Sequence, residues 1–273
     1  MKYSKRRVLT TVALIVLISL STFAQTKKPK RKHEIYFSWG YNTEWYTNSN
    51  VSVSQPSLGN NYTFKNISGH DHKGWDEGLF SKALTIPQYN YRLGFIINEE
   101  KGLGVEINFD HTKFIFADQN AHIKGTLANK PVDSTIAFNA NNGFFYYLNN
   151  GANFLLFNIV KRWKVHHSQN ENVKIDFLGK AGIGPVIPHV ENSFFGQKND
   201  PHFQFGGWNI GVEGALRATF FKYAYLEYSN KLDYARYSGL KIYEGTARQA
   251  FGTYEMILSI GLNFPIGKKV NVQ

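Results

Sequence analysis

Residues 253–264, near the end of the chain, alternate between apolar and polar side chains with a period of two. The apolar side carries Tyr254, Met256, Leu258, Ile260, Leu262 and Phe264, and the other carries Thr253, Glu255, Ser259, Gly261 and Asn263. A period of two indicates a β-strand with two different faces. In a soluble sandwich the apolar face would meet a second sheet. In a membrane barrel it would meet lipid, and the polar face would line the interior.

Seven further segments show the same alternation, so the sequence predicts eight strands. The others span residues 34–45, 88–98, 103–116, 143–165, 173–186, 203–220 and 224–234. The connections are long after the first, third, fifth and seventh strands and short after the second, fourth and sixth, which is the layout of transmembrane barrels. We therefore predict an all-β, eight-stranded antiparallel up-and-down transmembrane β-barrel with long external loops and short periplasmic turns. Its last strand is expected to pair with its first.

The long connections are expected at residues 47–86, 117–142, 188–202 and 235–250. Within the first of them, residues 51–53 and 62–64 alternate around a run of Ser, Gly and Asn residues. Such a pattern is typical of a hairpin. We therefore expect a hairpin to project from the first loop.

The N-terminus has the pattern of a secretory signal peptide. A basic segment precedes the apolar run 8–20, and the predicted cleavage follows Ala24. The apolar run is shorter than the roughly 20 residues that a membrane-spanning helix needs. The predicted organisation is a signal peptide at 1–24, a basic flexible tail at 25–33, an outer-membrane barrel at 34–264 and a periplasmic tail at 265–273.

The positive net charge is concentrated in the first 32 residues. The whole chain carries a formal charge of +11, of which four cations lie in the signal peptide and five in the basic tail, leaving +2 for the rest. A nearly neutral body argues against a nucleic-acid partner. The chain has no cysteine, so neither a disulfide nor a lipoprotein anchor on cysteine is available.

Charged residues recur on the polar side of the predicted strands. An eight-stranded barrel is just wide enough for side chains to fill its interior. Because both signs occur on this side, we expect a packed polar plug of ion pairs with no open pore. Its predicted members are Arg92, Glu106, Asp110, Lys174, Asp176, Lys180, Glu213, Arg217, Glu227, Lys231, Asp233 and Glu255.

His70, Asp71 and His72, with Asp76 and Glu77 nearby, are the candidate metal ligands. Imidazoles and carboxylates in one loop can bind a metal ion. Their spacing is not that of a zinc site, which favours the alternative of a solvated polar loop. The sequence contains no phosphate-binding loop or nucleophile elbow, so we predict no catalytic residues and no cofactor.

His111 and Lys113 have two interpretations. If the alternation continues, both side chains face lipid near the outer leaflet, where they would contact lipopolysaccharide phosphates. If a β-bulge shifts the register, both turn inward and join Asp110. The structural role is the one we favour.

The end of the last strand, with Ser259, Gly261, Leu262 and Phe264, resembles the terminal signal of bacterial outer-membrane barrels. This resemblance implies recognition by the barrel-assembly machinery. The segments IPQYNYRLG (86–94), FDHTK (109–113) and ARQAF (247–251) carry a wider resemblance, to small outer-membrane β-barrel proteins of the Bacteroidetes type. That family implies lipid and lipopolysaccharide as surroundings and implies no particular reaction.

Three functions remain open from the sequence. The leading hypothesis is a non-enzymatic outer-membrane protein, structural or surface-interacting through its long loops. The second is a lipid A modifying hydrolase similar to the outer-membrane deacylases, although Lys113 stands where their His-x-Ser pair needs serine, and Ser229 has no histidine two residues before it. The third is a narrow channel.

Overall fold

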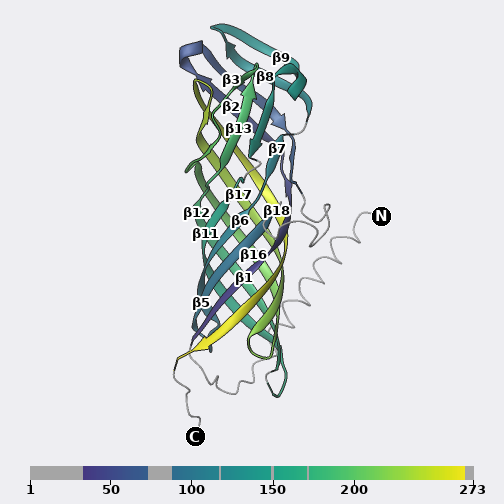
Figure 1. Cartoon of the computed structure of the whole chain (residues 1–273), viewed down its shortest axis with the longest axis vertical. Coiled ribbons are helices and arrows are strands. Elements are labelled where there is room, and N and C mark those ends of the chain that lie inside the picture. Colours follow the sequence, from purple (N-terminus) through teal and green to yellow (C-terminus); the bar gives the residue numbers. More distant parts are fainter. Residues whose placement is uncertain (1–32, 73–87, 117, 149–150, 171, 268–273) are drawn as a thin grey trace, which may run out of the picture.

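Eight antiparallel strands form a closed ring that makes up the body of the molecule (Figure 1). The computed structural model describes residues 33–72, 88–116, 118–148, 151–170 and 172–267. Around the ring the strands are β1 (His33–Tyr46), β5 (Tyr89–Asn98), β6 (Leu103–His111), β11 (Phe154–His167), β12 (Val173–Pro185), β16 (Gly207–Phe220), β17 (Ala224–Ile242) and β18 (Gly245–Ile266). Strand β1 pairs with β5 on one side and with β18 on the other. The predicted all-β antiparallel fold, with its first and last strands paired, is confirmed.

Several predicted features lie outside the described residues. These are the signal peptide, most of the basic tail, the acidic pair Asp76 and Glu77, and residues 268–273. Within the described residues, no helix is long and apolar enough to cross a membrane.

The wall of the ring has an apolar outer face and a polar inner face. Along β18, the outward side chains of Leu258, Ile260 and Leu262 are 43%, 57% and 48% exposed, whereas the inward side chains of Ser259 and Asn263 are buried. Every strand of the ring exposes large apolar side chains in this way, for example Phe37, Leu93, Ile107, Ile159, Ile183, Val212, Leu232 and Ile260. Apolar residues outside and charges inside invert the usual arrangement of a soluble protein.

One end of the ring carries short turns and the other carries additional β-structure. At the turn end, β5 joins β6, β11 joins β12 and β16 joins β17 through short connections, and His33 of β1 pairs there with Ile266 of β18. At the other end, the described residues form ten further strands, which we call the cap: β2 (Ser49–Gln55), β3 (Asn60–Ile67), β4 (Gly69–His70), β7 (Phe114–Phe116), β8 (Gln119–Leu127), β9 (Lys130–Phe138), β10 (Phe145–Leu148), β13 (His189–Phe194), β14 (Gln197–Lys198) and β15 (His202–Phe203). The two ends are separated along the long axis of the molecule (Figure 1).

The cap consists of two sheets. Strand β18 continues beyond the ring and pairs with β2, and β3, β8 and β9 follow in order, so the first cap sheet is a direct extension of the barrel wall. The second sheet has the order β14-β13-β10-β7-β4, with β15 paired to β13. Short 3-10 helices at Pro56–Leu58 and Ala140–Asn142 connect strands within the cap.

An aromatic core joins the two cap sheets. Phe64 of β3 is fully buried, and its ring centroid lies 5.2 Å from that of Phe138, 5.8 Å from that of Phe194 and 6.2 Å from that of Phe144. Phe194 belongs to β13 of the second sheet. Aromatic pairs at such separations are stabilising beyond the area that they bury. The cap is therefore a packed two-layer structure.

The predicted hairpin in the first loop is confirmed, because β2 and β3 pair around the turn that contains Pro56–Leu58. Three strand boundaries are wrong. The third ring strand ends at His111, and Phe114–Phe116 form β7 of the second cap sheet, because the chain leaves the wall there. The fourth begins at Phe154, after β10, and the sixth begins at Gly207, after β15.

Three of the predicted long loops are also wrong, because they form strands. The segment 188–202 contains β13 and β14. The segment 235–250 is a continuation of β17 and β18, which extend above the ring and are joined by the tight turn at Tyr243 and Glu244. The segment 117–142 contains the β8–β9 hairpin and the Ala140–Asn142 helix. Segments 235–250 and 117–142 are both polar on one face, which gives them a composition similar to that of a loop, and for this reason they were predicted as loops.

Candidate functional site in the barrel interior and the cap

Lys180 of β12 lies at the centre of a cluster of buried carboxylates inside the ring. Its Nζ is 3.1 Å from Glu106 Oε2, 2.9 Å from Glu213 Oε1 and 2.9 Å from Glu227 Oε1. These carboxylates come from β6, β16 and β17, and the alternation of each strand points them inward. One ammonium group thus links four strands of the ring.

Arg92 of β5 connects this cluster to a second one, which is formed by Asp110 and Lys231. Its guanidinium pairs with Asp110, and its Nη2 lies 3.4 Å from Glu213 Oε2. Its Nε is 3.8 Å from Glu106 Oε1, so two of its partners also contact Lys180. The two clusters therefore form a continuous network.

Lys231 of β17 extends the network toward the cap. Its Nζ is 2.7 Å from Asp110 Oδ2, 3.1 Å from Glu255 Oε1 and 3.4 Å from Asp233 Oδ2. All four side chains are nearly inaccessible to solvent. Buried charges are tolerated only when they are paired in this way.

Arg217 of β16 is held by one ion pair and two aromatic rings. Its Nε is 2.6 Å from Glu227 Oε2. Its guanidinium carbon lies 4.2 Å from the ring centroid of Tyr36 and 4.0 Å from that of Tyr225, which is the geometry of a double cation–π contact. The Tyr36 hydroxyl donates to Glu106 Oε2 at 2.8 Å and so connects Arg217 to the Lys180 cluster.

Two further ion pairs lie at the turn end. Arg162 Nη1 is 2.6 Å from Glu34 Oε1, and its Nη2 pairs with Glu99. His167 Nε2 is 2.9 Å from Asp176 Oδ1. Paired charges thus continue from Lys231 to the turn end, as expected for a ring whose interior is just wide enough for side chains to fill.

The sequence interpretation did not name several members of this interior. Glu34, Tyr36 and Arg162 are buried, and each contacts a residue of the network or of the turn end. A signal for Arg162 was present, because it lies four residues after the inward Asn158 and therefore on the same face of β11. Tyr36 lies two residues before Ser38, so the same alternation places it on the polar side of its strand, but its contact with Arg217 has no signal in the sequence.

The candidate metal ligands do not converge. Asp71 Oδ2 accepts hydrogen bonds from Thr43 Oγ1 at 2.9 Å and from the Glu44 backbone N–H at 2.8 Å. His70 Nδ1 lies 2.8 Å from the backbone oxygen of Asp71, and the backbone N–H of His72 donates to Gln88. Within the described residues, no group of three or more His, Cys, Asp or Glu side chains is arranged to hold a metal ion. Asp71 instead fastens the first loop to the mouth of the ring.

His111 and Lys113 occupy different environments. His111, the last residue of β6, stacks on the Tyr89 ring with a centroid separation of 4.6 Å, and its Nδ1 lies 2.8 Å from Asn153 Oδ1. Lys113 is buried, and its backbone oxygen accepts a hydrogen bond from the Tyr46 hydroxyl at 2.6 Å. Neither expected arrangement holds for both residues, because the strand ends between them. Of the two, only His111 keeps appreciable exposure at the wall.

The first cap sheet has one solvent-facing side made of hydroxyl, amide and charged side chains, which we call the cap face. One row of it crosses five strands, with Arg248 opposite Ser52, Ser52 opposite Thr63, Thr63 opposite Lys124 and Lys124 opposite Asp133. Other exposed members are Ser54, Asn61, Lys65, Asn120, His122, Thr135 and Thr246.

Charge on the cap face is mostly positive. Asp133 is held by Lys124 Nζ at 2.9 Å and by His122 Nε2 at 2.6 Å. The hydrogen bond from Lys124 holds the pKa of the Asp133 carboxyl below its usual range, so the group is ionised at neutral pH. Lys124 and His122 are thus already paired with Asp133. The other two cations of the cap face, Lys65 and Arg248, are the charges that this face offers to a partner.

The residues that resemble an assembly signal lie in the closing seam, the pairing of β18 with β1 that closes the ring. Ser259 and Gly261 face inward, opposite Gly40 and Ser38 of β1, while Leu262 and Phe264 face outward, opposite Phe37 and Ile35. A Cβ on Gly40 would lie 2.3 Å from the Leu258 backbone oxygen, so only glycine fits at this point of the seam. Strand β18 continues past Phe264 to Ile266.

We expect Phe264→Ala to lower the amount of assembled protein more than deletion of residues 265–273 does. Phe264 is half exposed on the outer face, where the barrel-assembly machinery could recognise its aromatic ring. The deletion removes only the last two described residue pairs between β1 and β18. Heat-modifiable folded protein in purified membranes measures the effect. Equal amounts from wild type and Phe264→Ala would contradict the prediction.

No protein-family model and no curated protein matches the sequence. Among solved structures, the chain is similar to Ail, the attachment invasion locus protein of Yersinia pestis, with 17% identity, 85% of this chain and 99% of that chain covered, and a TM-score of 0.32. It is also similar to the outer membrane protein OprG from Pseudomonas aeruginosa (10% identity, 86% and 98% covered, TM-score 0.39) and to Neisserial surface protein A (7%, 86% and 97%, 0.34). These neighbours are bacterial outer-membrane β-barrel proteins. The fold assignment itself rests on the strand pairing described above.

Proposed function

We propose that the protein is a non-enzymatic barrel of the bacterial outer membrane that anchors the cap at the cell surface. The observation that carries this proposal is the inverted wall, with apolar side chains outside on all eight strands and paired charges inside. A continuous exposed apolar surface of this kind requires lipid or a partner to cover it. Only a closed barrel satisfies all backbone groups of β-strands within a bilayer.

The cap is the part that would act outside the cell. Because the first cap sheet continues from β18, the anchor holds this sheet rigidly relative to the membrane. Among the described residues, this cap face carries polar and charged groups and no large apolar side chain, so a partner that binds there is hydrophilic. The turns at the opposite end then lie in the periplasm. In this arrangement the protein is structural or surface-interacting.

Single cysteines test this orientation, since the chain has none of its own. Thr135→Cys places a thiol on exposed β9 of the cap, and Glu100→Cys places one in the exposed turn between β5 and β6. In intact cells, we expect a membrane-impermeant maleimide to label Thr135→Cys only. After the outer membrane is permeabilised, both variants should be labelled.

The wild-type chain is the control, because it cannot react. Labelling of Glu100→Cys but not of Thr135→Cys in intact cells would reverse the orientation. Labelling of both variants in a soluble, detergent-independent fraction would contradict the barrel anchor itself.

A further inference from the structure

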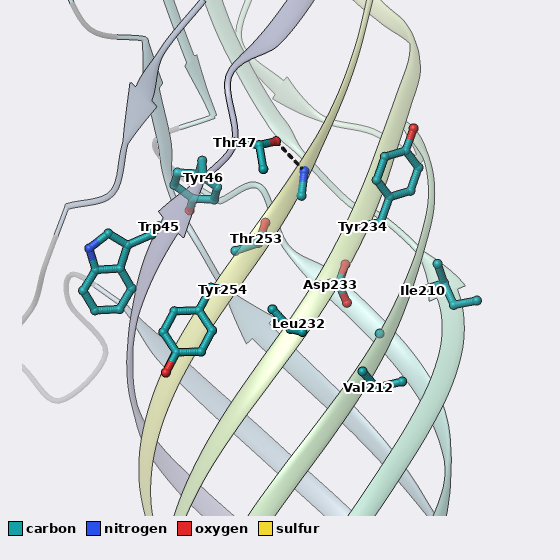
Figure 2. A pocket seen from close by; sticks show the side chains of 12 residues that line it. Trp45, Tyr46, Thr47, Ile210, Val212, Leu232, Asp233, Tyr234, Thr253 and Tyr254 are labelled. Carbon is teal, nitrogen blue, oxygen red and sulfur yellow. Dashed lines mark hydrogen bonds between the residues drawn. The ribbon is translucent and has the colours of Figure 1, made fainter. Parts of the chain in front are cut away.

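A recess of about 560 Å³ opens at the cap end of the ring wall, between the outward side chains of β1, β16, β17 and β18 (Figure 2). Trp45 and Tyr254 stand on one side of it, with ring centroids 5.6 Å apart, and Tyr234 stands on the other. Leu232, Ile210 and Val212 also line it. The recess lies where the apolar outer wall ends and the cap begins.

The recess exists because β18 presents small residues there. Its outward positions step from Tyr254 to Gly252 and Ala250, so the floor has almost no side chain. The strand is held in place by Thr47, whose backbone N–H donates to the Gly252 oxygen at 2.9 Å and whose hydroxyl accepts from the Gly252 N–H at 2.9 Å. A bulky residue at position 252 would fill the space.

The polarity of the surface changes along the recess. Below, toward the turn end, it is bounded by aliphatic side chains of β16 and β17. Above, the next outward position of β17 after Tyr234 is Arg236, which is exposed and pairs with Ala250. Two residues along a strand span about 7 Å, so this cation lies just beyond the aromatic rings. Aromatic residues at this level mark the boundary between hydrocarbon and headgroups.

We propose that this recess binds one acyl chain of a phosphorylated outer-leaflet glycolipid, with a phosphate of that lipid paired to Arg236. The aliphatic lower part fits the chain, the rings of Trp45 and Tyr254 lie at the level of its sugar, and the cation meets the phosphate. The inference rests on the proposed membrane anchor. It differs from the expected contact at His111 and Lys113, where Lys113 is buried.

Purified protein, folded in non-ionic detergent, is titrated with bis-phosphorylated hexa-acyl lipid A, and bound lipid is counted by native mass spectrometry. Gly252→Leu fills the floor, where an added Cβ lies 3.3 Å from Thr47 Cγ2, a side-chain atom that can yield. We expect it to raise the Kd about tenfold. Arg236→Gln should raise the Kd about threefold, as the loss of one exposed ion pair does.

Matched controls are Gly214→Leu, an outward glycine with no atom closer than 3.6 Å to an added Cβ, and Lys161→Gln, a cation at the turn end. Both should keep the wild-type Kd, and Arg236→Gln should not alter binding of dephosphorylated lipid A. Equal binding by wild type and Gly252→Leu would overturn the site. Equal affinity for phosphatidylglycerol would overturn the glycolipid assignment. Heat-modifiable migration of every variant shows that the barrel anchor holds, so loss of the site is distinguished from loss of the barrel.

Discussion

Lys180→Met is expected to lower the free energy of unfolding by about 3–5 kcal/mol, as removal of one partner from a buried ion-pair network does. The Lys180 ammonium is within 3.1 Å of carboxylate oxygens on Glu106, Glu213 and Glu227. Methionine keeps most of the side-chain volume but leaves these three carboxylates with one cation fewer. Their mutual repulsion in a solvent-excluded interior then opposes closure of the ring.

Urea titration of the folded protein in lipid vesicles, followed by tryptophan fluorescence, measures this change. Lys65→Met, on the exposed cap face, removes the same charge and should cost less than about 0.5 kcal/mol. Adding Glu106→Gln to Lys180→Met should recover part of the loss, because it removes one of the uncompensated charges. A Lys180→Met variant as stable as Lys65→Met would mean that the interior charges are solvated.

The ring could be predicted because alternation is a local signal. Inward positions follow one another at every second residue of a strand, so Glu213 and Arg217 lie on the same side of the wall, and this side follows from the sequence alone. Pairing partners do not follow in the same way. The Asp110–Lys231 contact joins residues 121 positions apart, and it requires the register of several intervening strands.

The cap was predicted only where its signal was local. The β2–β3 hairpin was recognised because its two halves are close in sequence. The second sheet was missed because β7, β10 and β13 come from separate connections, and none of the three exceeds six residues. Such short segments carry too few residues for a period to be recognised.

Strand ends explain the remaining errors at the candidate site. The interpretation of Lys113 assumed that the third strand continues to Phe116. Because the strand ends at His111, the alternation of that strand does not determine which way the Lys113 side chain points. Likewise, the outer recess depends on the chain leaving β1 after Tyr46, so that Thr47 bonds Gly252. Where a strand leaves a wall depends on what it packs against in space.

Phe64→Ala is expected to open the cap while the ring stays folded. The Phe64 ring joins the first cap sheet to Phe194 of the second, and truncation of a fully buried phenylalanine costs about 3–5 kcal/mol. The eight-stranded barrel is held by the pairing of its own strands and by its interior ion pairs, and Phe64 belongs to neither. We therefore expect trypsin to cleave the cap of the variant in intact cells, leaving a heat-modifiable, membrane-embedded core.

Thr63→Ala is the matched control, because Thr63 is the neighbour of Phe64 in β3 and its side chain lies on the cap face, outside the aromatic core. Its cap should resist trypsin as the wild type does. If Phe64→Ala removed the barrel from the membrane together with the cap, the two parts would be one cooperative unit. The cap would then contribute to closing the ring through the shared strands β17 and β18, and would not be a separate module on a finished anchor.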